Sequence, residues 1–152
     1  MILAIDPGRS KFGWALGTDK GEASLCGITP TERFREFVDI VWNEKWDLLK
    51  DWVTEKADVP ILKKPVTVIL GKGTGNALFA EVLDEKGISY VLVDEKFSTL
   101  GARDLFWDFH PPRGFKALIP KSLRVPPRDI DDLSALFLLR KWVESLKDGA
   151  ET

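Results

Sequence analysis

Short apolar runs separated by turn residues dominate the first thirty positions of the chain. Residues 2–6 are apolar up to Asp6, without alternation, which predicts a strand buried on both faces in the middle of a sheet. Residues 12–17 and 23–29 have strand composition, and residues 17–21 between them have turn composition. Because the connections are so short, we expect the three strands to form an antiparallel meander.

A helical pattern begins near residue 30. Residues 29–32 combine a capping hydroxyl, a proline and an acid, which are typical of a helix start. Apolar residues recur at helical spacing from Phe34 to Val41 and continue less regularly to Val53, with a break expected near 43–44. The tryptophans of this segment are expected to pack against the core rather than to stack on nucleobases.

The second half of the chain alternates strand and helix patterns. Residues 65–70 and 88–93 read as strands, and the helix expected between them makes the pair a parallel, right-handed crossover. A short helix is predicted at 98–107, followed by an irregular stretch at 108–128 that holds five of the nine prolines. A final amphipathic helix is predicted at 129–147.

A meander followed by a strand–helix–strand unit predicts a mixed α/β fold. We expect five strands in the order 3-2-1-4-5, numbered along the chain, with helices flanking the sheet. This is the topology of an RNase H-like domain. At 152 residues the chain is long enough to bury a core, and we expect residues 1–152 to form one such domain.

Composition narrows the possible chemistry. The formal net charge of −2 does not indicate a nucleic-acid-binding protein, so such a function requires local clustering of charge. The one cysteine, Cys26, and the one histidine, His110, exclude an internal disulfide, a cysteine-based zinc site and a histidine-rich metal site. No apolar run approaches the ~20 residues that span a bilayer, and the first residues do not resemble a signal peptide, so we expect a cytoplasmic protein without membrane contact.

Acidic residues stand at three places that this topology brings together. Asp6 follows the first strand, Glu95 follows the fifth, and Asp131 and Asp132 begin the last helix. Because strands 1, 4 and 5 run parallel, their carboxyl ends share one edge of the sheet, where ligands collect in open α/β sheets. Several carboxylates in one place attract Mg²⁺ or Mn²⁺, and two such ions ~4 Å apart can support phosphodiester hydrolysis. Alternatively, Asp6 only begins a hairpin turn, and the other acids are surface residues.

Basic residues supply a possible contact for phosphate groups. The segment from 113 to 128 contains five basic residues and no acidic one, and the same excess in a solvated loop would serve solubility alone. The three glycines at 71–76 precede a helix start, a weak signal of an anion cradle. The predicted nucleic-acid-binding residues are Arg9, Lys11, Lys72, Lys96, Arg113, Lys116, Lys121, Arg124 and Arg128.

Three segments resemble one known family. Residues 6–13 (Asp-Pro-Gly-Arg-Ser-Lys-Phe-Gly) resemble the opening Asp-x-Gly-x-Lys-Arg-Ile-Gly of the YqgF/RuvX-like Holliday junction resolvases, also described as pre-16S rRNA processing nucleases. Residues 93–99 (Val-Asp-Glu-Lys-Phe-Ser-Thr) are similar to the family's Val-Asp-Glu-Arg-Leu-Ser/Thr-Thr. Residues 131–139 resemble its Asp-Ser-Leu-Ala-Ala start of the last helix.

The resemblance implies roles for the acidic residues. Asp6, Glu95 and Asp131 would be the metal-binding carboxylates, and Asp132 is the alternative to Asp131, because a shift of one residue exchanges them. It also implies a catalytic role for these acids in cleaving branched DNA or trimming a ribosomal RNA precursor with Mg²⁺ or Mn²⁺. A homodimer fits two-strand cleavage at a junction.

The sequence also departs from the family pattern. Ser10 stands where the family has Lys, and Lys11 and Lys96 stand where it has Arg, which removes a bidentate phosphate contact. Gly71 ends strand 4, where other RNase H-like nucleases place an acid. Glu95 lies one strand further from Asp6, about 9–10 Å by strand spacing, so it needs its full side-chain length or a water to share a metal.

The leading hypothesis is therefore a metal-dependent nuclease. The alternative is a nucleic-acid-binding module that has kept the fold and cleaves poorly. Half of an actin-like ATPase, whose phosphate loop also follows a first strand, ranks last because its chemistry requires a cleft between two domains.

Overall fold

The computed structural model describes residues 1–73, 75–96, 98–120 and 124–150, without the side chains of Thr99, Lys116 and Ala150. Within these residues, one mixed sheet has the strand order β4-β3-β2-β1-β5-β6. Neighbours from β4 to β1 pair antiparallel, and β1, β5 and β6 pair parallel. The strands are β1 (Ile2–Asp6), β2 (Lys11–Gly17), β3 (Ala23–Pro30), β4 (Val53–Lys56), β5 (Thr67–Gly71) and β6 (Val91–Val93).

The expected mixed α/β sheet is confirmed. The predicted order 3-2-1-4-5 corresponds to β3-β2-β1-β5-β6, with the meander and the parallel crossover in place. This arrangement of directions is that of an RNase H-like sheet. The predicted number of five strands was wrong, because β4 adds a further strand at the edge beside β3.

The helices follow the predicted order. They are α1 (Phe34–Trp42), α2 (Asn76–Glu85), α3 (Ser98–Phe109) and α4 (Asp131–Ala150), with short 3₁₀ turns at Thr31–Arg33, Trp46–Leu49 and Gly114–Leu118. The predicted break after α1 is confirmed: α1 stops at Trp42, and Glu44 takes a left-handed backbone conformation with φ of 55°. The apolar pattern beyond the break was wrongly expected to be helical, since Val53 begins β4.

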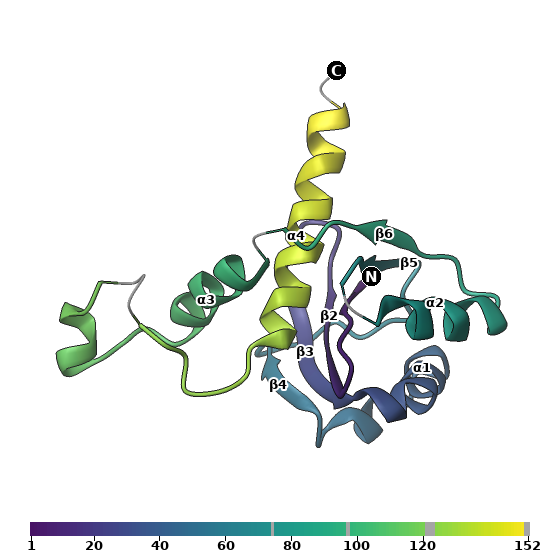
Figure 1. Ribbon diagram of the computed structural model, residues 1–152, viewed down its shortest axis with the longest axis horizontal. Coiled ribbons are helices and arrows are strands. Elements are labelled where there is room, and N and C mark those ends of the chain that lie inside the picture. Colours follow the sequence, from purple (N-terminus) through teal and green to yellow (C-terminus); the bar gives the residue numbers. More distant parts are fainter. Residues whose placement is uncertain (74, 97, 121–123, 151–152) are drawn as a thin grey trace.

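Alternate side chains of the central strands build two cores, one on each face of the sheet. Figure 1 shows the helices that lie beside the sheet. On one face, Phe12 packs edge-on against Phe34 and Phe37 of α1 and Phe79 of α2, with ring centroids 5.2 to 5.5 Å apart. Trp42, Trp46 and Trp52 pack on this core while remaining partly exposed, which agrees with the packing role predicted for them.

The opposite face of the sheet is covered by α3 and α4. Gly101 of α3 lies against the ring of Phe137, and a Cβ at this position would overlap that ring. Among the described residues, no helix combines the length and the apolar character needed to cross a bilayer.

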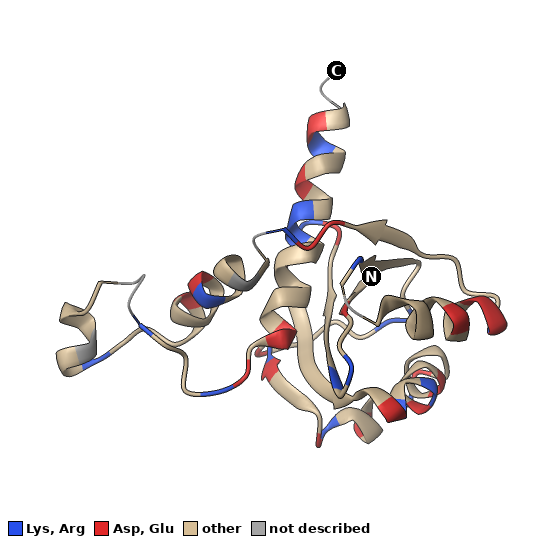
Figure 2. Cartoon of the chain, viewed as in Figure 1, with Lys and Arg blue, Asp and Glu red and all other residues tan. Residues whose placement is uncertain are grey.

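Apart from the edge strand β4, which carries Glu55 and Lys56, the strands of the sheet are almost free of charged residues (Figure 2). The sequences of β3, β5 and β6 contain no charged residue, while β1 and β2 carry only Asp6 and Lys11. Because β1 and β2 are antiparallel, Asp6 and Lys11 stand at the same end of that pair. This end is the carboxyl edge of the parallel strands β1, β5 and β6.

Candidate active site

Asp131 reaches Asp6 because a glycine lies between them. Asp6 ends β1 and pairs with Gly13 of β2. The backbone of Asp131 and Asp132 at the start of α4 lies directly on Gly13, where a Cβ would overlap the carbonyl of Asp131. The absent side chain therefore lets α4 approach the sheet beside Asp6, and the charge of Asp131 acts on Asp6.

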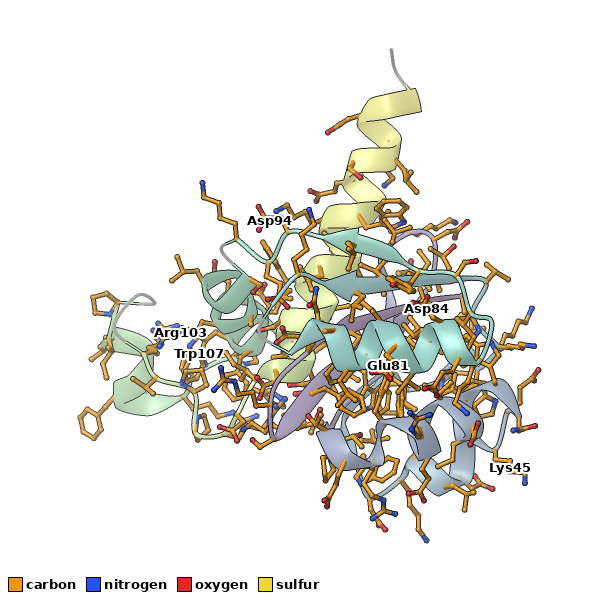
Figure 3. All side chains as sticks on the ribbon, turned by 45° about the vertical axis from the view of Figure 1, so that its right-hand side comes forward. Lys45, Glu81, Asp84, Asp94, Arg103 and Trp107 are labelled. Carbon is orange, nitrogen blue, oxygen red and sulfur yellow. The ribbon has the colours of Figure 1, made fainter. Side chains whose placement is uncertain are left out.

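Glu95 reaches the same place across the glycine-rich loop. It follows β6 and Asp94, which is labelled at the upper edge of the sheet in Figure 3. Its carboxylate lies over Gly71 and Gly73, and a Cβ on either glycine would overlap the carboxylate oxygens. Glu95 thus fills the volume that a side chain at the end of β5 would occupy. Because β5, which lies between β1 and β6, ends in Gly71, the side chain of Glu95 can reach across it toward Asp6.

The meeting of Asp6 and Glu95 is electrostatically strained. Burial is the main cause that raises the pKa of Asp6 from 3.8 to about 9, and the Glu95 carboxyl and the charge of Asp131 add to it. Oε1 of Glu95 is itself buried and has no hydrogen-bond partner among the described residues. Two carboxyl groups facing each other with little solvent favour sharing a proton or binding a cation.

Lys11 forms an ion pair with the third carboxylate of the predicted site, that of Asp131. Its ammonium group forms ion pairs with Asp129 and, at 3.4 Å, with Asp131. The hydrogen bond to Asp129 is the main reason why the pKa of Lys11 is raised. Within the described ranges, no three His, Cys, Asp or Glu side chains are placed to hold one metal ion together. Asp6 and Glu95 meet, whereas Asp131 stands near them and pairs with Lys11.

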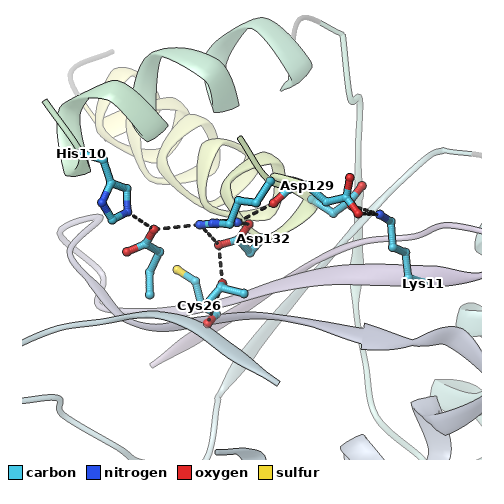
Figure 4. Close-up of polar contacts among 9 residues, drawn as sticks. Lys11, Cys26, His110, Asp129 and Asp132 are labelled. Carbon is cyan, nitrogen blue, oxygen red and sulfur yellow. Dashed lines mark hydrogen bonds and ion pairs between the residues drawn. The ribbon is translucent and has the colours of Figure 1, made fainter. Parts of the chain in front are cut away.

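Asp132 occupies a different place from its neighbour. It is fully buried, and its carboxylate accepts hydrogen bonds from Thr54 Oγ1 at 2.6 Å and from Arg128 Nη1 at 2.9 Å (Figure 4). The buried thiol of Cys26 lies close by, and its pKa is raised by burial and then by the charge of Asp132. Asp131 and Asp132 are therefore not interchangeable: Asp131 lies beside Asp6, and Asp132 belongs to a buried ion pair.

The ion pair of Asp132 extends to the edge strand and to the end of α3. Arg128 Nη2 donates to Glu55 of β4 at 2.8 Å, and Nε2 of His110 lies 2.6 Å from the same Glu55 oxygen. Sequence reasoning did not identify Thr54, Glu55 or His110 as partners of Asp132 and Arg128. No local signal could have done so, because Glu55 and Arg128 are 73 residues apart.

The predicted basic residues divide into two groups. Loops at the carboxyl edge carry Arg9, Lys72 and Lys96, with Lys11 at the start of β2. The remainder lie in the segment after α3, and two of them are engaged within the protein. The Arg128 guanidinium binds Asp132 and Glu55, so it is not available to phosphate as predicted. The Arg124 guanidinium donates to the carbonyl of Ile119 at 2.8 Å.

The other members of this second group are Arg113, Lys116 and Lys121. Arg113 is exposed. Lys121 and the side chain of Lys116 lie outside the described residues, so their predicted contacts have no structural counterpart.

Similarity to known proteins is found among solved structures. The sequence matches no protein-family model and no curated protein. Among solved structures, Thermus thermophilus RuvC aligns with 15% identity and a TM-score of 0.42, covering 97% of this chain and 96% of that one. RuvC of the same organism in complex with a Holliday junction substrate aligns with 15% identity and a TM-score of 0.39, covering 97% and 95%. At this sequence identity and with these TM-scores, neither similarity supports a conclusion about this chain.

Proposed function

We propose that this chain is a metal-dependent nuclease that hydrolyses phosphodiester bonds in structured nucleic acid. The observation that supports this most is the meeting of Asp6 and Glu95 over Gly71 at the carboxyl edge of the sheet. Asp131 at the start of α4 is the third acid of the proposed site. Carboxylates from three distant parts of the chain thus gather where α/β sheets bind their ligands.

The residues at this place fit a hard divalent cation. Oε1 of Glu95 is buried without a hydrogen-bond partner among the described residues, and the pKa of Asp6 is raised, which together favour a cation at this place. Carboxylate oxygens without cysteine or histidine are the ligands that Mg²⁺ and Mn²⁺ prefer. When bound, such an ion polarises a phosphodiester and lowers the pKa of a water ligand. Asp6 and Glu95 would hold it, and Asp131 would join them when Lys11 releases it.

The basic side chains near this edge would position the substrate. Arg9, Lys72 and Lys96 project from loops that leave the sheet beside Asp6 and Glu95, so they can contact phosphates on either side of the cleaved bond. Lys11, freed from Asp131, would add a further cation. The sequence resemblance to the YqgF/RuvX-like proteins is our reason for proposing a branched DNA junction or a ribosomal RNA precursor as substrate, with a homodimer acting on junctions.

A second candidate is a nucleic-acid-binding module on the same fold that cleaves poorly. The ion pair between Lys11 and Asp131 favours it, because the ammonium group neutralises the third carboxylate without any metal. In this case the basic residues would bind phosphate while Asp6 and Glu95 share a proton.

Cleavage of four-way junctions and of precursor ribosomal RNA, with Mg²⁺ or Mn²⁺, tests the leading proposal. We expect cleavage by the unmodified protein and a loss of at least about 100-fold in Asp6→Asn, since removing a metal ligand removes the catalytic ion. Gly71→Ala should lose activity similarly while folding normally, because its Cβ displaces only the flexible end of Glu95.

Asp94→Asn is the matched control. Asp94 is exposed, adjoins Glu95 in sequence, and its carboxylate accepts a local hydrogen bond from the backbone N–H of Lys96. Equal cleavage by the unmodified protein and Asp6→Asn would overturn the nuclease. Calorimetric titration with Mn²⁺ separates the two candidates, since a binding module would show no metal affinity that depends on Asp6.

A further inference from the structure

An open pocket lies between the end of α3 and the segment that follows it, on a part of the molecule that the proposed active site does not use. Its volume is about 630 Å³, within the range of sites that hold small molecules. The walls are formed mainly by rings: Phe106 and Trp107 of α3, His110, and Phe115 of the following 3₁₀ turn. Figure 3 shows Trp107 on α3 next to this projecting segment.

One side of the pocket is rigid and the other is open. Phe106 packs edge-on against Trp107 with ring centroids 4.9 Å apart, and the ring of His110 lies 4.9 Å from Phe106. Phe115, in contrast, is 88% exposed and contributes almost nothing to the core. A large aromatic side chain that exposed is available to stack on a planar ligand.

Trp107 belongs to the packed side of the pocket. It is 8% exposed, and its Nε1 is buried and has no hydrogen-bond partner among the described residues. The ring therefore forms part of the apolar wall, and the polar groups that could contact a ligand come from other lining residues.

The charges around the pocket favour an anionic ligand. Arg113 lines it, is exposed and has no ion pair within the described ranges. The guanidinium groups of Arg124 and Arg128 lie 5.7 and 5.5 Å from the ring centres of Trp107 and Phe106. Of the residues that line the pocket, His110 contacts the carboxylate of Glu55, which is also paired with Arg128.

We propose that this pocket binds an unpaired nucleobase of a nucleic-acid strand, with Phe115 stacked on the base and Arg113 on an adjoining phosphate. Planar rings with a cation beside them are the usual means of holding single-stranded nucleic acid without reading its sequence. The inference rests on the proposed function in that it takes nucleic acid as the ligand. It specifies the substrate class further, to structures in which a base next to the duplex is unpaired.

The test uses a short single-stranded oligonucleotide that contains one 2-aminopurine, whose fluorescence falls when the base stacks. The oligonucleotide is titrated with the full chain carrying Asp6→Asn, in buffer with EDTA, so that it is bound without being cleaved. We expect binding to quench the fluorescence. Adding Phe115→Leu should abolish the quench and weaken binding about 10-fold, whereas Phe115→Tyr should retain both because it keeps a stacking ring. Leu118→Ala is the matched control, since Leu118 is 83% exposed in the same turn and does not line the pocket.

Two results would overturn the pocket assignment: an unchanged quench in Phe115→Leu, or equal affinity for an oligonucleotide with an abasic site in place of the 2-aminopurine. Junction cleavage without any quench would refute the base pocket and leave the nuclease intact. A quench that depends on Phe115 in a protein that never cleaves would refute the nuclease and leave the pocket.

Discussion

At the scale of single residues, three aspartates have three different environments. Asp6 meets another carboxyl group and has a raised pKa, Asp132 is buried against a guanidinium group, and Asp129 is exposed beside Lys11. The intrinsic chemistry of the side chain is the same in each case. Burial and the sign of the neighbouring charge decide which one can bind a cation.

The raised pKa of Asp6 predicts how stability depends on pH. The folded protein binds this proton more tightly than the unfolded chain, so without metal the free energy of unfolding should fall as pH rises between 3.8 and about 9. Asp6→Asn has no such proton and should lose most of this slope. Urea unfolding in EDTA across the window measures it, with Asp94→Asn expected to keep the slope of the unmodified protein. A slope unchanged by Asp6→Asn would contradict the assignment.

At the scale of elements, the first residues of α4 contact β2, and this contact brings Asp131 close to Asp6. Gly13 is the point of contact, and it pairs with Asp6 in the sheet. The sequence motif at 6–13 therefore contains both the first acid and the glycine that admits the helix carrying the third acid. A side chain at position 13 would hold α4 away from the sheet.

Gly13→Ala should consequently destabilise the fold. Its Cβ would overlap rigid backbone at Asp131 and Asp132, and such overpacking costs about 1–3 kcal/mol. Gly149→Ala is the control, because a Cβ there meets no atom of the described residues within 4 Å, and in the last turn of α4 it should stabilise by at most about 0.5–1 kcal/mol. Denaturant unfolding of both variants provides the measurement. Equal stability of Gly13→Ala and the parent would show that α4 is not seated on Gly13.

At the scale of the whole molecule, one network of ion pairs and hydrogen bonds, centred on the buried Asp132, connects parts that are distant in sequence. Asp132 in α4, Thr54 and Glu55 in the edge strand β4, and His110 after α3 are connected through Arg128. The network secures β4 to the helix that carries Asp131. It thus connects the edge of the sheet to the place where the proposed active site is formed.

Asp132→Asn should therefore act on stability. The substitution removes one of the two acidic partners of Arg128 and leaves Glu55 as the other, and we expect a loss of about 2 kcal/mol in the free energy of unfolding. Asp129→Asn, whose side chain is 70% exposed, should change it by less than about 1 kcal/mol. Chemical denaturation compares the two neighbours directly. If Asp132→Asn kept full stability yet abolished cleavage, Asp132 would be catalytic instead.

The sequence by itself determined the strand order from β3 to β6, the helices and the three acidic positions. These follow from local periodicity and from the direction of parallel strands, both of which are present in neighbouring residues. It did not predict β4, because four residues with a single apolar side chain carry no strand pattern, and pairing with β3 decides their conformation. Only the tertiary structure decided that Asp131 faces Asp6 while Asp132 is buried, and that Glu95 lies over Gly71. Such outcomes depend on how closely backbones approach across the fold, which no short stretch of sequence specifies.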